Sequence, residues 1–373
     1  MSKQSSKANF YPIILAGGRG TRFWPLSRKR MAKQLLPLNT KKSMIQETVE
    51  RLAPLADKKH FWVITNDDLV QPIARQLRGV PQKQLVAEPV GRNTAPAIGL
   101  AAFILERLDP NAVLGLFPSD HVTAKDQQFR KDIAKAVALA AAGENIVVLG
   151  IKPTRPETGY GYIEVGEQFE RGVMRVRRFT EKPNAEKAAE FVEAGHYFWN
   201  SGVFVWSAKT LANALREHLR ETAPFLEKIA ASYGTRDFKR TFARLYPKCE
   251  NISVDYAILE PRSAKGSHNS NIFCIPADWG WNDLGSWAAL FEHRAAEQQL
   301  TENENVMASK GSFTHDSGGN FVHAPKKFVA VVGVKDLVVV ETEDALLITT
   351  RKNSQDVGKV VKFLDERKLH KLV

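Results

Sequence analysis

Cysteines and long apolar runs are scarce in this sequence. Only two of its 373 residues are cysteines, Cys249 and Cys274. Two thiols cannot form the disulfide framework of a small secreted domain, and no cysteine or histidine spacing matches a structural zinc motif. No uninterrupted apolar run is long enough to cross a bilayer. The polar residues 1–10 lack the apolar stretch of a secretory signal. We expect a disordered tail at 1–10, a cytoplasmic protein and no membrane association.

Acidic residues are outnumbered by basic ones. Lys and Arg total 53 against 41 Asp and Glu, which leaves a formal net charge of +12. This balance suits an anionic ligand, and nucleic acid is the obvious alternative. The basic residues are spread along the chain rather than gathered in one arm, and no nucleic-acid-binding motif accompanies them. We therefore favour a small anion over nucleic acid.

The most informative stretch is Tyr11–Pro37. Its apolar start, residues 12–15, is typical of a buried parallel strand. A glycine cluster follows at once: Gly17, Gly18 and Gly20. Glycines allow positive φ and let backbone N–H groups converge on an anion, and the cations that follow could neutralise phosphate oxygens. The stretch predicts a triphosphate-binding loop at the end of the first strand.

Two well-known phosphate loops do not fit this stretch. A Walker A loop requires Gly-Lys-Ser/Thr, which does not occur in the chain. A dinucleotide-binding loop requires a third glycine where Phe23 stands. Taken alone, the glycine cluster could also be a structural turn.

The complete string is more specific. G-G-x-G-T-R-x-x-P-L, followed eleven residues after Arg22 by Lys33, resembles the nucleotide loop of sugar-1-phosphate nucleotidyltransferases. Its F-W-P-L-S-R version resembles the mannose-1-phosphate guanylyltransferase branch of that family. One departure is Ala32, where the family usually has proline before the signature lysine. The resemblance covers residues 11 to about 290 in separate motifs and extends loosely to about 350.

Strand and helix signals alternate over the first 150 residues. Strands are predicted at 61–65, 84–87, 113–117 and 145–150, and helices at 43–52, 69–77, 97–107 and 129–142. Pro72 would have to lie in the first turn of its helix. This alternation predicts an α/β fold, a parallel sheet with helices on both faces that binds ligands beyond the carboxyl ends of its strands. The resemblance implies a Rossmann-like, mixed but mainly parallel sheet of the GT-A-like type.

The order of predicted strands and helices is different in the rest of the chain. Strands are predicted at 159–165, 173–180 and 197–206, with helices at 185–194, 208–231, 236–245 and 286–298. From about residue 302, short apolar segments predict stacked strands, as in a small β-helix, and a helix at 357–369 closes the chain. We predict a catalytic domain at 11–295 and a small domain at 296–373. Exposed stacked strands favour pairing with a second copy, so we expect a homodimer.

Two acidic residues are candidates for binding Mg²⁺. Asp120 follows an apolar strand in Pro-Ser-Asp-His, and Asp283 lies in Trp-Asn-Asp-Leu-Gly-Ser-Trp. Mg²⁺ commonly takes one or two carboxylates plus substrate oxygens. Asp120 could instead cap a helix, and Asp283 could occupy a turn. The resemblance implies that both bind the metal and that Asp120, Arg22 and Lys33 are catalytic. We interpret His121 as structural.

Candidates for the sugar phosphate lie in the second half. Lys182, in Glu-Lys-Pro, could grip a phosphate or simply be solvated. Glu181 could accept hydrogen bonds from hydroxyl groups, and Gly159 could let a sugar approach the backbone. Asn200 lies in an apolar run and needs a partner if buried, which a ligand or a neighbouring strand could supply. The resemblance implies that these four residues line the sugar-1-phosphate pocket.

The segment 88–96 resembles the base-recognition loop of the family. Guanine offers donors that suit the acceptor groups of Glu88, Asn93 and Thr94, and the backbone of residues 15–17 could take part. The resemblance implies the following nucleotide-binding set: Leu15, Ala16, Gly17, Gly18, Gly20, Thr21, Arg22, Glu88, Asn93, Thr94 and Ser119.

The implied reaction transfers GMP from GTP to mannose 1-phosphate, which gives GDP-mannose and pyrophosphate. Glucose 1-phosphate with UTP or dTTP is an alternative, although the F-W-P-L-S-R and W-N-D-L-G-S-W strings favour mannose. A non-catalytic nucleotide-sugar sensor is another, but such a protein would be expected to lose Arg22, Lys33 or a metal ligand. Longer family members carry a fused phosphomannose isomerase domain. With the sequence ending at Val373, we expect only the transferase activity.

Overall fold

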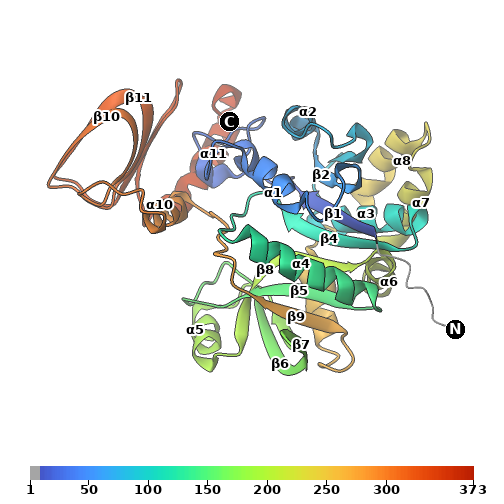
Figure 1. The fold of residues 1–373 in the computed structure, drawn as a ribbon. Coiled ribbons are helices and arrows are strands. Elements are labelled where there is room, and N and C mark those ends of the chain that lie inside the picture. The colour runs from blue at the N-terminus through green and yellow to red at the C-terminus, as the bar shows by residue number, and fades with distance from the viewer. Residues whose placement is uncertain (1–8) are drawn as a thin grey trace.

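The computed structural model describes residues 9–373 and contains a nine-stranded mixed sheet with a four-stranded sheet at one end (Figure 1). The predicted tail at 1–10 lies mostly outside the described residues. Its last two residues, Asn9 and Phe10, already belong to the first strand, which therefore begins earlier than predicted. No helix in the described part of the chain is long and apolar enough to cross a membrane.

The large sheet has the strand order β3-β2-β1-β4-β8-β5-β9-β7-β6. Its strands are β1 (Asn9–Leu15), β2 (Trp62–Asn66), β3 (Leu85–Glu88), β4 (Ala112–Pro118), β5 (Ile146–Ile151), β6 (Tyr162–Glu170), β7 (Val173–Thr180), β8 (Tyr197–Ser207) and β9 (Ile272–Ala277). Strands β3, β2, β1 and β4 are parallel, so their carboxyl ends share one edge. Strand β8 is antiparallel to both β4 and β5 and joins the two halves. The predicted α/β class with a mixed sheet is confirmed.

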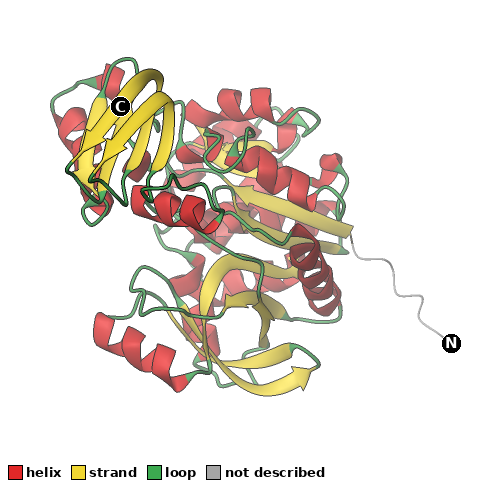
Figure 2. Ribbon diagram, turned by 60° about the vertical axis from the view of Figure 1, so that its left-hand side comes forward, coloured by secondary structure: helices red, strands yellow, loops and turns green. Residues whose placement is uncertain are grey.

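Helices cover both faces of this sheet (Figure 2). The helices of the chain are α1 (Met44–Leu52), α2 (Asp67–Gln76), α3 (Thr94–Leu108), α4 (Asp126–Ala141), α5 (Ala185–Ala194), α6 (Ala208–His218), α7 (Ala223–Ser232), α8 (Phe238–Leu245), α9 (Glu260–Ser263), α10 (Trp287–Ala296) and α11 (Val357–Glu366). One core contains α3, α6, α7 and α8, and the other contains α1, α2 and α4. Neighbouring residues of β1 face opposite cores, Ile13 the first and Ile14 the second, as the two-residue period of a strand requires.

Two helix predictions need correction. Helix α2 begins at Asp67, because the side chain of Asn66 caps it by accepting a hydrogen bond from the N–H of Leu69 (3.2 Å). Pro72 therefore lies beyond the first turn, to which it was expected to belong. The helix predicted at 208–231 is two helices, α6 and α7. Pro224 lies at the start of α7, where its missing N–H costs nothing. Within a continuous helix from α6, the same proline would remove a backbone hydrogen bond.

The small sheet is made of stacked strands, as predicted. Its strands are β10 (Val306–His315), β11 (Phe321–Val332), β12 (Leu337–Glu341) and β13 (Leu346–Thr350). The first three are parallel and β13 is antiparallel to β12. The buried Asn305 and Asn320 stack between successive turns: Asn320 donates to Oδ1 of Asn305 (2.8 Å) and accepts from the N–H of Leu337 (2.8 Å). These bonds satisfy buried backbone groups at the turns.

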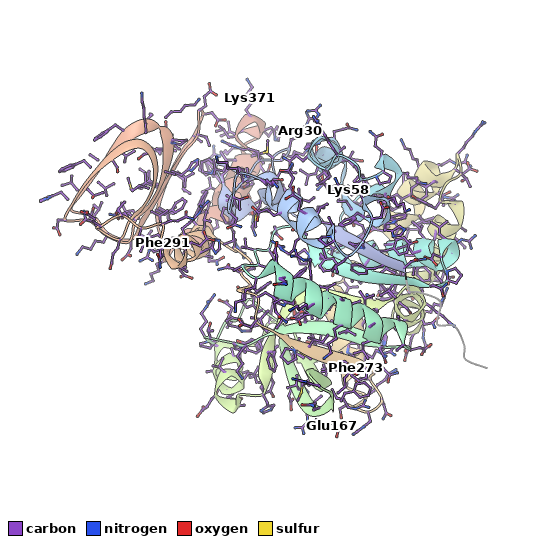
Figure 3. The ribbon with its side chains drawn as sticks, viewed as in Figure 1. Arg30, Lys58, Glu167, Phe273, Phe291 and Lys371 are labelled. Carbon is purple, nitrogen blue, oxygen red and sulfur yellow. The ribbon has the colours of Figure 1, made fainter. Side chains whose placement is uncertain are left out.

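The small domain packs on the glycine-rich loop. Helix α11 lies between the small sheet and the helix α1 (Figure 1). Phe23 and Trp24 share a core with residues of α11, and the indole N–H of Trp24 donates to the carbonyl of Leu372 (2.8 Å). Phe291, on α10, lies beside the small sheet, while Glu167, on β6, lies at the lower edge of the molecule, away from the small sheet (Figure 3). The loop between β1 and α1 is therefore supported by both domains.

Candidate active site

The glycine-rich loop begins directly after β1. Its carbonyl oxygens are engaged by side chains: Gln34 donates to Ala16 (2.8 Å) and Gly18 (3.0 Å), and Asn66 donates to Gly17 (3.1 Å). In the described part of the chain, the N–H groups of Gly17, Gly18 and Gly20 have no acceptor. Such free amides are suited to binding phosphate oxygens.

Only glycine fits at position 20. The residue has φ of +63°, and an added Cβ would lie 2.2 Å from Cβ of Lys33. Its carbonyl accepts bonds from the N–H of Phe23 (2.9 Å) and the hydroxyl of Ser27 (2.8 Å). This turn starts the short helix η1 (Thr21–Phe23) and holds Arg22 exposed beside the loop.

A cleft of about 350 Å³ lies beside η1. It is lined by residues from three segments distant in sequence: Gly20, Thr21, Arg22, Phe23, Lys33, Asp120, His121, Asp283 and Gly285. All the residues predicted to be catalytic or metal-binding therefore meet at one cleft. Asp120 follows the carboxyl end of β4 and is the residue that the β1–β4 edge was expected to present.

Lys33 is the central charge of this cleft. Its side chain is only 6% exposed, and its ammonium nitrogen lies 2.8 Å from Oδ2 of Asp120 and 2.6 Å from the carbonyl oxygen of Asp283. Burial would raise the pKa of Asp120, but the ammonium of Lys33 holds it below its ordinary value. Asp120 is therefore a carboxylate at neutral pH.

The segment that carries Asp283 is clamped against the segment after Asp120. Val122 and Asn282 exchange backbone bonds of 2.8 and 3.1 Å. The hydroxyl of Tyr160 donates to Oδ1 of Asp283 (2.7 Å), and burial together with this carboxylate raises the pKa of Tyr160, so the hydroxyl stays protonated. His121 accepts from the indole of Trp281 (3.2 Å) at Nδ1, and burial lowers its pKa. This environment favours a neutral, orienting histidine, and the structural role of His121 stays a prediction.

Among the predicted base-recognition residues, Glu88 lies next to the glycine loop, and Asn93 and Thr94 lie at the start of α3. Glu88 accepts from the hydroxyl of Tyr246 (2.6 Å), and burial raises its pKa. A Cβ on Gly17 would lie 3.5 Å from Oε2 of Glu88, which places this carboxylate beside the loop. Asn93 caps α3 through the N–H of Thr94 (2.9 Å), and Oγ1 of Thr94 accepts from the N–H of Val254 (2.9 Å).

The remaining nucleotide-binding candidates hold the loop in place. The backbone N–H of the buried Ser119 donates to the carbonyl of Leu15 (3.2 Å), and Ala16 is buried. The hydroxyl of Thr65, which the sequence did not single out, also donates to the carbonyl of Ala16 (2.9 Å). These bonds tie the ends of β1, β2 and β4 together.

Three of the predicted sugar-phosphate residues form one cluster. Lys182 has φ of +48° and its ammonium pairs with Oε1 of Glu181. The amide of Asn200 donates to Asp255 (3.0 Å) and its carbonyl oxygen accepts from the N–H of Gly202 (2.9 Å). A Cβ on Gly202 would lie 3.1 Å from Pro118, so this cluster adjoins the loop that carries Asp120.

Gly159 lies outside the tightest part of this cluster. Its N–H donates to Glu157 (3.0 Å), whereas the position without room for a side chain is Gly161, where a Cβ would lie 2.4 Å from Oε2 of Glu181. Sequence reasoning missed three residues here: Gly161, Tyr160 and Asp255. The available signal for Asp255 was a lone carboxylate in the mostly apolar segment 252–259.

A larger cleft elsewhere contains none of the predicted site residues. It has a volume of about 580 Å³ and is lined by Asn39, Thr40, Lys41, Lys42, Glu47, Glu50, Arg51, Thr123, Ala124 and Asp126. Four of its charges are paired within the protein, Arg51 with Asp126 (2.8 Å) and Lys42 with Glu50 (2.6 Å). Size alone therefore does not identify the candidate active site.

Comparison with known proteins identifies the family to which both parts of the chain are similar. Residues 11–300 match the family model described as nucleotidyl transferase, and residues 313–364 match the one described as MannoseP isomerase/GMP-like beta-helix domain. The mannose-1-phosphate guanylyltransferase RfbM of Salmonella typhimurium is 38% identical, with 95% of this chain and 72% of the relative covered. The alginate biosynthesis protein AlgA of Pseudomonas aeruginosa shows the same identity and coverage.

A solved structure is similar over nearly the whole chain. The crystal structure described as mannose-1-phosphate geranyltransferase from Thermus thermophilus has a TM-score of 0.83 and 32% identity, with 96% of this chain and 99% of that chain covered. The mannose-6-phosphate isomerase from Helicobacter pylori has a TM-score of 0.58 and 26% identity over 74% of this chain and 99% of that chain. Both domains are therefore found together in a chain of similar extent.

Proposed function

The chain belongs to the nucleotidyl transferase family, and we propose that it transfers GMP from GTP to mannose 1-phosphate, with release of pyrophosphate. The observation that carries this proposal is the position of Lys33, whose ammonium joins Asp120 and Asp283 in the cleft lined by Arg22. The reaction requires two anionic substrates to meet, and their negative charges repel. Cations and free backbone amides at this cleft would neutralise that repulsion.

We assign the nucleotide to the side formed by the glycine loop. The unpaired N–H groups of Gly17, Gly18 and Gly20 bind phosphate oxygens, and Arg22 and Lys33 neutralise them. Glu88, Asn93 and Thr94 hold the base, with Ser119 and the backbone of Leu15 and Ala16 shaping the floor. The carboxylate of Glu88 beside Gly17 supports this assignment, because guanine presents two neighbouring donors.

The sugar phosphate is assigned to the other side. Lys182 binds its phosphate, and Glu181, Asn200 and the backbone around Gly159 contact the sugar. This cluster is linked to the cleft through Tyr160, which adjoins Gly161 in the chain and bonds to Asp283. The link supports a shared site for the two substrates.

The chemical step is an in-line displacement at phosphorus. An oxygen of mannose 1-phosphate forms a bond to the α-phosphorus of GTP, and the bond from that phosphorus to the bridging oxygen breaks, with its electron pair leaving on pyrophosphate. Positioning and electrostatics supply the catalysis, without a covalent intermediate. Arg22 stabilises the negative charge on the leaving group, and Lys33 and Lys182 hold the two substrates in line.

The residues present fit a divalent cation. Asp120 and Asp283 line the same cleft and would supply hard oxygen ligands. Mg²⁺ commonly takes one or two carboxylates and completes its coordination with substrate oxygens and water. Residues 9–373 contain no cluster of three or more His, Cys, Asp or Glu side chains placed to hold a metal by themselves. When bound, Mg²⁺ would supply charge neutralisation and orientation of the phosphates.

We assign dimerisation to the small domain at 296–373. Large apolar side chains are exposed on its strands: Phe313 (54%), Phe328 (67%), Leu346 (56%) and Ile348 (63%). Contact with a second copy would remove this surface from water. Analytical ultracentrifugation of the parent and an Ile348→Lys, Leu346→Lys variant tests the assignment, since a dimer through this face should dissociate.

The two cysteines, Cys249 and Cys274, are buried free thiols, which suits the reducing cytoplasm that we propose for this protein.

The decisive experiment measures pyrophosphate release over a grid of GTP, UTP, dTTP and ATP with mannose 1-phosphate and glucose 1-phosphate, with and without Mg²⁺. We expect turnover with GTP and mannose 1-phosphate in the presence of Mg²⁺. Preference for UTP or dTTP with glucose 1-phosphate would reassign the substrates. Binding without turnover of any pair would indicate a sensor.

A further inference from the structure

Asp255 occupies an unusual place in the fold. It opens a wide π-helical turn, residues Asp255–Leu259, that continues into α9. Turns of this kind are rare and are found frequently at functional sites, because the extra residue re-aims a side chain. Here the turn directs the carboxylate of Asp255 at Asn200, whose amide it accepts at 3.0 Å.

The cluster around Asp255 is short of positive charge. The carboxylate of Glu181 repels that of Asp255, and Glu260 accepts a bond from the backbone N–H of Glu181 (2.7 Å). Lys182 is the one cation among these neighbours, and it pairs with Glu181. Burial and then the charge of Glu181 raise the pKa of Asp255 to about 7. Holding these acids close together lowers the stability of the folded state, because like charges repel.

One oxygen of the cluster has no partner. The side chain of Glu181 is only 7% exposed, and its buried Oε2 has no hydrogen-bond partner among residues 9–373. This oxygen lies over Gly161, where a Cβ would be 2.4 Å away. A buried carboxylate oxygen without a donor is costly unless a ligand supplies one.

Resting on the proposed function, we propose that Asp255 is a substrate-contacting, specificity-determining residue, which together with Glu181 accepts hydrogen bonds from hydroxyl groups of the hexose 1-phosphate. A sugar hydroxyl is the donor that Oε2 of Glu181 lacks, and the carboxylate of Asp255, which already accepts from Asn200, has further lone pairs to accept a second bond. Lys182 beside them would bind the phosphate of the same molecule. A site built to bond a hydroxyl discriminates strongly against a substrate without it, because the acceptor is then left buried and unpaired. The pair would thus select the sugar rather than speed the chemical step.

A purely structural role for Asp255 makes a different prediction. In that case the carboxylate only holds the amide of Asn200, and an asparagine at position 255 could still accept that bond. Asp255→Asn should then retain the parent's affinity for the sugar phosphate. If Asp255 contacts the sugar, the loss of its charge weakens binding even though Asn200 stays in place.

The test compares the parent with Asp255→Asn and Asp255→Ala, and with Asp237→Ala as a control that removes an exposed, ion-paired carboxylate on the surface. Binding of mannose 1-phosphate is measured by calorimetry, and KM and kcat for both substrates by pyrophosphate release. We expect both Asp255 variants to bind mannose 1-phosphate about 10- to 100-fold more weakly, the range of a hydrogen bond to a charged group. KM for GTP should stay within about twofold of the parent in these variants and in the control.

Deoxy analogues of mannose 1-phosphate complete the test. The parent should lose affinity for the analogue that lacks the contacted hydroxyl, and Asp255→Ala should show no further loss with that analogue. Parent-like binding by Asp255→Asn, or equal losses for every analogue in parent and variant, would overturn the proposal. A parent that turns over no sugar phosphate would instead overturn the proposed function.

Discussion

The ammonium nitrogen of Lys33 lies 2.8 Å from Oδ2 of Asp120, and the side chain of this lysine is almost fully buried. The pair joins the segment after the glycine loop to the end of β4. A buried charge that loses its partner is strongly destabilising, so the pair belongs to the architecture of the cleft as well as to its chemistry.

Lys33→Met should lower both activity and stability. We expect kcat to fall about 10²- to 10³-fold, as for loss of one preorganised electrostatic contact. The lysine lowers the pKa of Asp120 in the folded protein, so its contribution is present above the ordinary pKa of aspartate, about 3.9, and is lost as the pH falls through the lower folded value. The Tm difference from the parent should therefore be larger at pH 7 than at pH 3. Lys29→Met, at an exposed ion pair, is the control.

Arg22→Ala should abolish most turnover without disturbing the fold. Arg22 is exposed, and no hydrogen bond or ion pair within the described residues holds its guanidinium. We expect a loss of about 10²- to 10³-fold in kcat and an unchanged Tm. Steady-state kinetics and thermal unfolding check this, with Arg30→Ala, at another exposed arginine, as the matched control. Parent-like turnover would reject the assignment of the loop.

Tyr160→Phe should weaken the response to Mg²⁺. The hydroxyl orients Asp283 through a 2.7 Å bond, and loss of a group that orients a metal ligand typically costs about 10- to 100-fold in metal affinity. The Mg²⁺ concentration for half-maximal activity should rise accordingly. Tyr11→Phe removes a similar tyrosine–carboxylate bond, to Asp109 at 2.9 Å, in a different part of the sheet and should leave this concentration unchanged. Equal Mg²⁺ dependence in both variants would contradict Asp283 as a ligand.

Gly358→Val, a substitution in the small domain, should impair catalysis at the cleft. A Cβ at position 358 would lie 3.3 Å from Oγ1 of Thr21, so a larger side chain must push on the segment that carries Arg22. We expect kcat to fall at least about tenfold. Lys359→Val introduces the same side chain at an exposed site of α11 and controls for the helix cost of valine. Because the clash involves Oγ1, Thr21→Ala combined with Gly358→Val should lose less than the sum of the single effects.

The stability of the protein should depend on Asp255 in the opposite sense to Asp120. The folded pKa of Asp255, about 7, lies above its unfolded value, so the folded state holds the extra proton and stability falls as the pH rises from about 4 to above 7. Asp255→Asn removes this dependence. Its Tm should exceed that of the parent by several degrees at pH 8, with little difference at pH 4. A Tm gain that is the same at both pH values would show that Asp255 does not titrate in this range.

Local patterns explain why much of the fold was predictable. Strand β1, the capping box of Ser43 and Gln46 and the helix α5 each follow from a few neighbouring residues, and the structure confirms them. The helix boundaries that were predicted wrongly depend on one capping hydrogen bond or on one interruption of a helix. Asn66 extends α2 past its expected start, and the break before Pro224 divides one apolar stretch into two helices.

The sequence by itself determined which residues are chemically able to handle phosphate and at which strand ends they lie, because a glycine loop and strand periodicity are local properties. Only the tertiary structure decided that Lys33 bridges Asp120 and Asp283, that Tyr160 orients one of these acids and that Asp255 joins Glu181 and Asn200. These contacts join residues far apart in the chain. They depend on how sheet and loops pack, which no local pattern encodes.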